Sequence, residues 1–194
     1  MTARLRLDDE SGFSLSEMLV VLAILGVVLG ALTQLFLSGA QTTRDQSNRF
    51  RAQQEGRLAL DGLRREIHCA ENISGTIPGS SITITLGAYC PTNSTGADAT
   101  VTWCALPASG TAPYSLWRTA LNQPCTSSGS SCTSTGCVLK AEFLTVNQVF
   151  TGLVPAGAGL RAKLSVRLPV DASTTTAGGL YELQDDIVLR NTLR

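Results

Sequence analysis

The sequence predicts an α+β protein in which one long amino-terminal helix is followed by a head built on an antiparallel β-sheet. Three observations predict this fold. Met18 to Leu37 form an uncharged apolar run, helix-forming residues then continue to Cys69, and no proline occurs before Pro78. From about residue 71, short apolar or alternating runs recur between clusters of Gly, Ser, Thr, Asn and Pro, which is typical of strands and turns.

Length and charge limit the class of protein. The chain has 194 residues, which suits one globular core with an appendage. Its 15 basic and 15 acidic residues cancel, so nucleic acid is a possible partner that the charge does not indicate. We predict four parts: a cytoplasmic leader (1–12), a transmembrane half-helix (13–37), an amphipathic soluble half-helix (38–70) and a β-rich head containing disulfides (71–194).

The apolar run has the length of a membrane span. About twenty residues at ~1.5 Å each cross a hydrocarbon core of roughly 30 Å, and only Thr33 and Gln34 in this run are polar. An ordinary secretory signal peptide would have a shorter apolar stretch and a small-residue cleavage site. A generic single-pass anchor remains possible on hydropathy alone.

The residues at the head of this run, "SGFSLSEMLVVLAILG", resemble the type IV pilin superfamily. The resemblance implies that a prepilin peptidase cuts on the cytoplasmic side after Gly12 and methylates the new amino terminus at Phe13. It also identifies Glu17 as the assembly glutamate, which meets the terminal amine of a neighbouring subunit. Ser16 departs from the pattern, since the family usually has an aliphatic residue there, and the acidic residues 8–10 depart from its usual basic leader.

Physical chemistry agrees with a role for Glu17 in assembly. The new amine of Phe13 would lie within one helical turn of Glu17, at a helix end that carries partial positive charge. In a low-dielectric environment, a charge left without its partner costs free energy. The ion pair would therefore favour one axial position of each subunit relative to its neighbour. The alternative is a glutamate at the lipid headgroups. Gly26 and Gly30 form a small-xxx-small pattern that either packs helices closely or arises by chance.

The soluble half of the helix should pack on the head. Leu60, Leu63, Ile67 and Ala70 recur at spacings of three and four, which gives one apolar stripe. A helix from residue 13 to about 69 would be about 85 Å long, with residues 56 and 62, both glycine, as possible soft points. The resemblance implies the same lollipop shape.

Six segments of the head are predicted as strands: 81–86, 100–106, 114–121, 138–146, 160–170 and 181–190. Residues 101–106 should pair with 114–118, and this hairpin, with the terminal "DDIVLRN", resembles PilW-type minor pilins and the J-type pseudopilins of type II secretion. Asp185 and Asp186 should point to opposite faces of their strand, so they do not form a catalytic pair.

The cysteines favour disulfides over a metal site. None is spaced as C-x-x-C and His68 is the single histidine, so zinc would need an unusual ligand set, whereas disulfides suit an oxidising compartment. The six are Cys69, Cys90, Cys104, Cys125, Cys132 and Cys137.

Sequence alone does not choose among the 15 possible pairings of six cysteines. A meander sheet favours Cys69 near Cys104, with Cys90 near the loop that holds the other three.

The sequence predicts no enzyme, cofactor or metal, because it lacks a histidine-based triad and a phosphate-binding loop. We predict a minor pilin or pseudopilin, held in the inner membrane with its head outside the cytoplasm and later assembled into a pilus or pseudopilus. Its partners would be other pilins, a prepilin peptidase, the inner-membrane assembly platform and lipid. The alternative is an anchored binding module for DNA, a surface or a partner protein in DNA uptake or type II secretion. Its contact candidates are Tyr89, Trp103, Tyr114 and Trp117.

Overall fold

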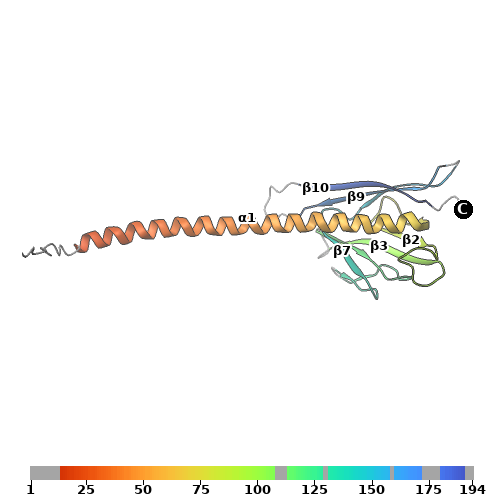
Figure 1. The fold of residues 1–194 in the computed structure, drawn as a ribbon, viewed down its shortest axis with the longest axis horizontal. Coiled ribbons are helices and arrows are strands. Elements are labelled where there is room, and N and C mark those ends of the chain that lie inside the picture. Colours follow the sequence, from red (N-terminus) through yellow and green to blue (C-terminus); the bar gives the residue numbers. More distant parts are fainter. Residues whose placement is uncertain (1–13, 108–112, 129–130, 158–159, 172–179, 191–194) are drawn as a thin grey trace, which may run out of the picture. The chain divides into compact units, whose positions relative to one another are not determined.

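The structure is a computed structural model of the chain, and it describes residues 14–107, 113–128, 131–157, 160–171 and 180–190. The chain divides into two compact units, Met1–Arg44 and Asp45–Arg194. One α-helix, α1 (Leu15–Cys69), contributes to both units (Figure 1). The units are described separately below.

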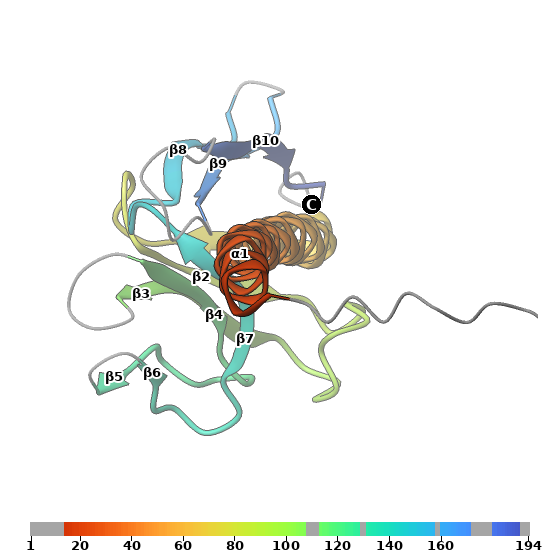
Figure 2. The same cartoon turned by 90° about the vertical axis from the view of Figure 1, so that its left-hand side faces the viewer.

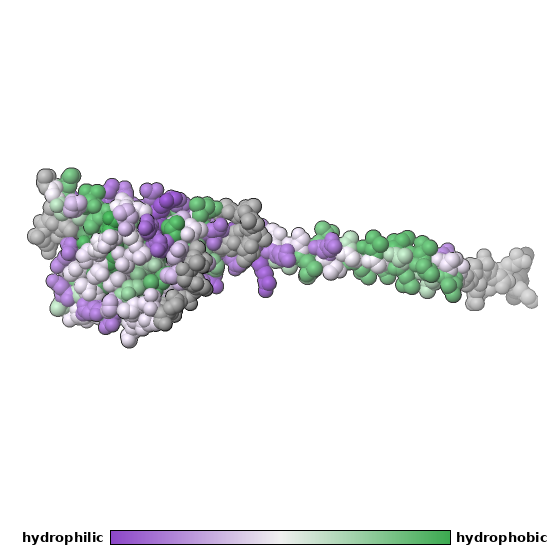
Figure 3. All heavy atoms as spheres, turned by 180° about the vertical axis from the view of Figure 1, so that it is seen from behind, coloured by the Kyte–Doolittle hydropathy of each residue, from purple (hydrophilic) through white to green (hydrophobic). Residues whose placement is uncertain are grey.

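In the first unit, α1 exposes its apolar residues on all sides. An 18-residue window has a mean hydropathy of 2.5 and none of it is buried, so by length and composition α1 could cross a membrane. Figure 3 shows apolar residues gathered along this part of the helix. The Thr33 hydroxyl donates to the carbonyl of Leu29 at 2.8 Å. This polar side chain is therefore satisfied within the helix itself.

In the second unit, α1 buries one face against the sheet. The buried positions are Ala52, Gly56, Ala59, Leu60, Leu63, Glu66 and Ile67, which recur every three or four residues. The predicted stripe is confirmed, because Leu60, Leu63, Ile67 and Ala70 are all buried.

The helix continues without a break through Gly56 and Gly62, so neither glycine interrupts it, and their role as soft points stays a prediction. A Cβ at Gly56 would lie 3.1 Å from Leu183 Cδ1 and 3.7 Å from Val170 Cγ2. The glycine therefore lets the sheet approach the helix closely.

The head is an antiparallel sheet with the order β1-β2-β3-β4-β7-β9-β10, in which β8 also pairs with β9. Viewed along the helix, the strands curl around α1 (Figure 2). A separate two-stranded ribbon is formed by β5 and β6. The strands are β1 (Ala70–Ser74), β2 (Ser81–Leu86), β3 (Ala99–Pro107), β4 (Tyr114–Arg118), β5 (Ser127–Ser128), β6 (Ser131–Cys132), β7 (Val138–Leu144), β8 (Phe150–Val154), β9 (Lys163–Val170) and β10 (Tyr181–Val188).

The α+β class is confirmed, and each of the six predicted segments contains a strand. The predicted hairpin is also present, with Trp103 opposite Arg118 and Pro107 opposite Tyr114. Sequence reasoning missed two strands of the main sheet, β1 and β8. β1 has the sequence "AENIS" and follows the helix directly, and β8 has a glycine at its centre.

The two adjacent aspartates of β10 point to opposite faces, as predicted. Asp185 accepts hydrogen bonds from Arg64 Nε at 3.1 Å and Nη2 at 2.7 Å, and this bonding raises the pKa of Arg64. Asp186 instead accepts from Ser165 and Lys163 of β9. The hydrogen bond from Ser165, followed by that from Lys163, lowers the pKa of Asp186 below its ordinary value.

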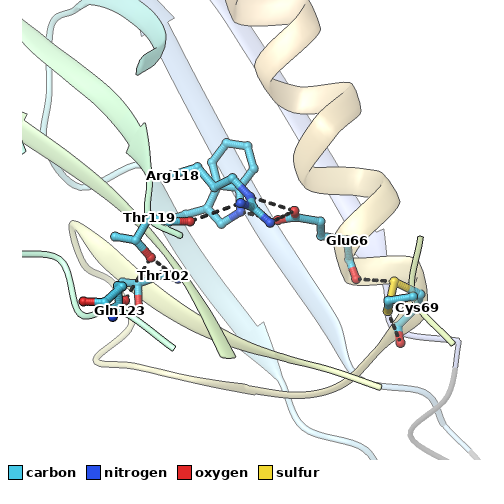
Figure 4. Close-up of polar contacts among 8 residues, drawn as sticks. Glu66, Cys69, Thr102, Arg118, Thr119 and Gln123 are labelled. Carbon is cyan, nitrogen blue, oxygen red and sulfur yellow. Dashed lines mark hydrogen bonds and ion pairs between the residues drawn. A yellow bond between two sulfur atoms is a disulfide. The ribbon is translucent and has the colours of Figure 1, made fainter. Parts of the chain in front are cut away.

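A buried carboxylate joins α1 to the centre of the sheet (Figure 4). Glu66 is 3% exposed, and it accepts hydrogen bonds from Trp103 Nε1 at 2.6 Å and Arg118 Nε at 2.8 Å. Arg118 Nη2 also lies 2.7 Å from Glu66 Oε1. Because Trp103 and Arg118 are direct cross-strand partners on β3 and β4, both reach the same carboxylate. One helical residue therefore fixes two strands.

The same network extends into the segment that follows β4. Arg118 Nη1 donates to the Thr119 carbonyl at 3.1 Å. The Thr119 hydroxyl accepts from the Thr102 amide at 3.0 Å and donates to the Gln123 carbonyl at 2.9 Å. This segment is thereby held along β3 after β4 has ended.

Replacing Glu66 by alanine should destabilise the head by up to about 3 kcal/mol, because it leaves Arg118, whose side chain is 16% exposed, and the buried Trp103 Nε1 without their partner. The double change Glu66→Leu and Arg118→Met should cost much less, because it removes both charges. The measurement is urea unfolding of the full chain in detergent, followed by tryptophan fluorescence. If the double variant were as unstable as Glu66→Ala, the ion pair would not be the source of the loss.

Candidate assembly site

The amino-terminal turn of α1 carries the candidate assembly glutamate. The Ser14 carbonyl accepts from the Glu17 amide at 3.0 Å and the Met18 amide at 3.2 Å, and the Ser14 and Ser16 hydroxyls are 2.8 Å apart. Glu17 is exposed in the first turn, where the helix end favours negative charge. Ser16, unusual for the pilin pattern, thus has a local partner.

The predicted cleavage and methylation site, Gly12 and Phe13, lies outside the described residues. The pairing of Glu17 with an amino terminus therefore stays a prediction. What the structure provides is a carboxylate in the first helical turn with its side chain exposed.

The two glycines of the apolar run have open space beside them. A Cβ built at Gly26 or Gly30 would meet nothing within 4 Å, and Val27 between them is 74% exposed. Among the described residues nothing packs beside these two glycines, and their role in helix contacts stays a prediction.

All six cysteines are paired in disulfides: Cys69–Cys90, Cys104–Cys125 and Cys132–Cys137. The Cα atoms of each pair are 5.5, 6.4 and 6.1 Å apart, respectively, within the range for disulfides. In chain order, the first cysteine thus bonds to the second, the third to the fourth and the fifth to the sixth.

The predicted proximity of Cys69 to Cys104 is wrong, and so is the placement of Cys90 near the other three cysteines. The reason is the missed strand β1. Ala70 lies opposite Leu86, and Leu86 lies opposite Ala99, so the end of α1 is beside the start of β3. Cys104 lies near the other end of β3, opposite Ser81.

A buried asparagine, which sequence reasoning missed, shapes the loop that carries Cys90. Asn93 is 7% exposed, and its Nδ2 lies within 3.2 Å of the carbonyls of Leu86, Gly87 and Ala97. Its Oδ1 accepts from the Thr95 amide at 3.1 Å. The Asn93 side chain thus bonds to three carbonyls and one amide of the main chain in and beside this loop. The Cys69–Cys90 disulfide also ties the loop to α1.

The candidate contact aromatics separate into buried and accessible groups. Trp103 is 1% exposed and donates to Glu66, so it is not available for surface contact. Trp117 and Tyr114 are half-buried. Tyr89 is 53% exposed, although its hydroxyl donates to the Cys69 carbonyl at 3.0 Å. The single histidine, His68, contacts the Val188 carbonyl at 3.0 Å and is part of the fold.

Comparison with known proteins identifies the amino-terminal segment. Residues 8–33 match the family model described as the prokaryotic N-terminal methylation motif. This segment contains Gly12, Phe13, Glu17, Gly26 and Gly30. No curated protein and no solved structure matches the chain.

The motif supports a type IV pilin-like protein that is processed as a prepilin. It implies cleavage by a prepilin peptidase and assembly with other pilin subunits. Together with the exposed apolar part of α1, it fits a membrane-anchored pilin.

Removing Cys69–Cys90 by a double change to alanine should destabilise the head more than removing Cys132–Cys137. The sequence separations are 21 and 5 residues, so loop entropy predicts losses of about 3 and about 2 kcal/mol. The first disulfide also joins α1 to the Asn93 loop. Urea unfolding of both double variants measures the difference, and non-reducing peptide mapping checks the pairing. A peptide containing Cys69 linked to Cys104 would contradict the structure.

Proposed function

We propose that this chain is a minor pilin or pseudopilin, a structural subunit stored in the inner membrane and assembled into a type IV pilus or a related filament. Its leader is cut after Gly12, Phe13 becomes the methylated amino terminus, and Glu17 fixes the position of the subunit in the filament. The hairpin and last strand of the head favour a PilW-type minor pilin or a J-type pseudopilin.

The observation that carries this proposal is the coincidence of the methylation motif with an exposed apolar helix. The motif occupies residues 8–33, and α1 begins at Leu15 with every residue to Leu37 exposed. A helix that is apolar on all sides is stable in lipid or among other apolar helices. Membrane storage followed by assembly provides these two environments in turn.

Glu17 fits a registry role because its charge would be costly in lipid. A carboxylate near a membrane core costs several kcal/mol unless it is paired or near the headgroups. The amine created at Phe13 by cleavage is a counter-charge that the uncut chain lacks. A subunit seated correctly would satisfy both charges, whereas a staggered one would leave both unpaired.

The disulfides support a head outside the cytoplasm. Three disulfides occur in a head of ordinary size, and such bonds form and persist in oxidising compartments. The Glu66 network and the Cys69–Cys90 disulfide then hold this head on the soluble part of α1.

Co-expression with a prepilin peptidase should yield a chain whose amino terminus is methylated Phe13, as read by intact-mass and amino-terminal peptide mass spectrometry. A Gly12→Leu variant is the control, and it should keep its leader because the residue before the cut has changed. A wild-type chain that still began before Phe13 would remove the basis for the pilin proposal and favour a generic anchored protein.

Glu17→Ala should be processed normally but should be missing from sheared surface filaments, because the subunit loses the charge that fixes its position. Thr33→Val is the matched control, since the Thr33 hydroxyl is bonded inside its own helix and should not be needed between subunits. Immunoblotting of filament and membrane fractions measures both variants. Normal incorporation of Glu17→Ala would contradict the registry role.

A further inference from the structure

A polar groove lies on the face of the sheet that points away from α1. Ile82, Ile84 and Trp103 are buried on the inner side of β2 and β3, so the residues that alternate with them point outward. The groove has a volume of about 380 Å³, within the usual range of ligand pockets. It is lined by Ser81, Thr83, Thr100, Thr102, Asn122, Gln123, Pro124 and Cys125.

The floor of the groove is a patch of hydroxyl groups on two paired strands. Thr83 of β2 lies opposite Thr102 of β3, and their Oγ1 atoms are 3.2 Å apart. Ser81 and Thr100 extend the patch along the two strands. Each hydroxyl can donate one hydrogen bond and accept two. After Thr83 and Thr102 bond to each other, the pair therefore still has one hydrogen to donate and lone pairs that can accept.

One wall of the groove belongs to residues 119–125, which are held along β3 at both ends. At the start, the Thr119 hydroxyl accepts from the Thr102 amide at 3.0 Å (Figure 4). At the end, Cys125 is bonded to Cys104 of β3. The wall is therefore in place before a ligand arrives, which lowers the entropic cost of binding.

Asn122 in this wall presents an amide donor in a fixed position. Its φ of 58° lies in the left-handed region, which asparagine tolerates better than most residues. Its main-chain amide donates to the Thr100 carbonyl at 2.7 Å, and its Oδ1 accepts from the Thr100 amide at 2.9 Å. These contacts occupy Oδ1, whereas Nδ2 has no acceptor among the described residues. The two N–H groups of Nδ2 are thus available to a ligand.

The groove carries no charge among the described residues that line it. They provide hydroxyls, two side-chain amides, a proline and a cysteine that is already in a disulfide. A charged ligand would lose part of its hydration there without gaining a counter-charge. A ligand rich in hydroxyls both donates and accepts hydrogen bonds, as the groove does. An uncharged sugar has this chemistry.

We propose that this groove binds a neutral oligosaccharide. The hydroxyls of Ser81, Thr83 and Thr100 exchange hydrogen bonds with sugar hydroxyls, and Asn122 Nδ2 donates to a sugar oxygen. No aromatic side chain is among the described lining residues, so ring stacking does not contribute and we expect weak binding. The site goes beyond the proposed function and does not depend on it, because the groove lies wholly within the second unit of the chain.

Saturation-transfer NMR on the purified full chain tests this site. The chain is kept in a detergent without a sugar headgroup, so that the micelle does not compete for the groove. The neutral probes are cellobiose, chitobiose and maltose, and the charged probe is cellobiouronic acid, which carries a carboxylate. We expect at least one neutral probe to receive saturation from the protein and to bind more tightly than the charged probe.

Three variants show whether the bound sugar lies in the groove. Thr83→Val removes a floor hydroxyl but keeps the branched shape, and it should weaken binding about fivefold by the loss of one hydrogen bond. Asn122→Asp keeps an oxygen for the Thr100 amide but replaces the free donor with an acceptor and adds a charge, so it should weaken binding about tenfold or more. Thr85→Val is the matched control, because Thr85 lies on the same face of β2 as Thr83 but does not line the groove.

Two kinds of result would overturn the proposed site. One is that no neutral probe binds the wild-type chain, or that the charged probe binds more tightly. The other is that Thr83→Val binds the sugar as tightly as Thr85→Val does. Urea unfolding of each variant shows whether the head is folded, and Thr83→Val decides alone if Asn122→Asp is not. Failure of the site would leave prepilin processing and filament incorporation as they are, so it is distinct from failure of the proposed function.

Discussion

The head depends on one buried carboxylate, Glu66, and on the two donors that meet it. A carboxylate that is 3% exposed is unstable unless its charge and its lone pairs are satisfied. Arg118 supplies the counter-charge and Trp103 a further hydrogen bond. Both donors come from one cross-strand pair, so the carboxylate is satisfied only when the helix is seated at one position on the sheet. Apolar contacts along the stripe supply burial but tolerate sliding, whereas this network does not.

A single helix meets two kinds of surroundings, and its sequence changes accordingly. From Met18 to Leu37 its residues are exposed and, apart from Thr33 and Gln34, apolar, whereas from Ala52 its buried positions fall on one face. The second part is fixed by specific polar contacts, such as Arg64 with Asp185 and Arg57 with the Tyr181 hydroxyl at 2.8 Å. The first part has no such contacts in the described chain, which suits a segment whose neighbours are lipid or other subunits.

Periodicity predicted the long helix, its stripe and six strands, because each of these is a repeat of apolar residues with a clear period. It did not predict β1, where Glu71 and Asn72 are exposed and no turn separates the strand from the helix. That omission also produced the wrong expectation that Cys69 lies near Cys104, because one missed strand reverses which end of β3 lies beside Cys69. Glu66 could have been noticed, since it lies between Leu63 and Ile67 on the stripe, where an unpaired charge would be costly. Its partners are 37 and 52 residues away, and their identity depends on strand register, which local sequence does not encode.

Two features of α1 make demands on their surroundings for different physical reasons. Glu17 is a charge at the start of an apolar helix, and its cost falls only when it is paired or lies near the headgroups. The residues from Met18 to Leu37 are exposed, and their apolar surface is stable only in lipid or among other apolar helices. Under the proposed function, the apolar surface would hold a subunit among its neighbours without fixing its position, because apolar contacts tolerate sliding. The charge of Glu17 would supply the missing information, because only one position brings an opposite charge to it.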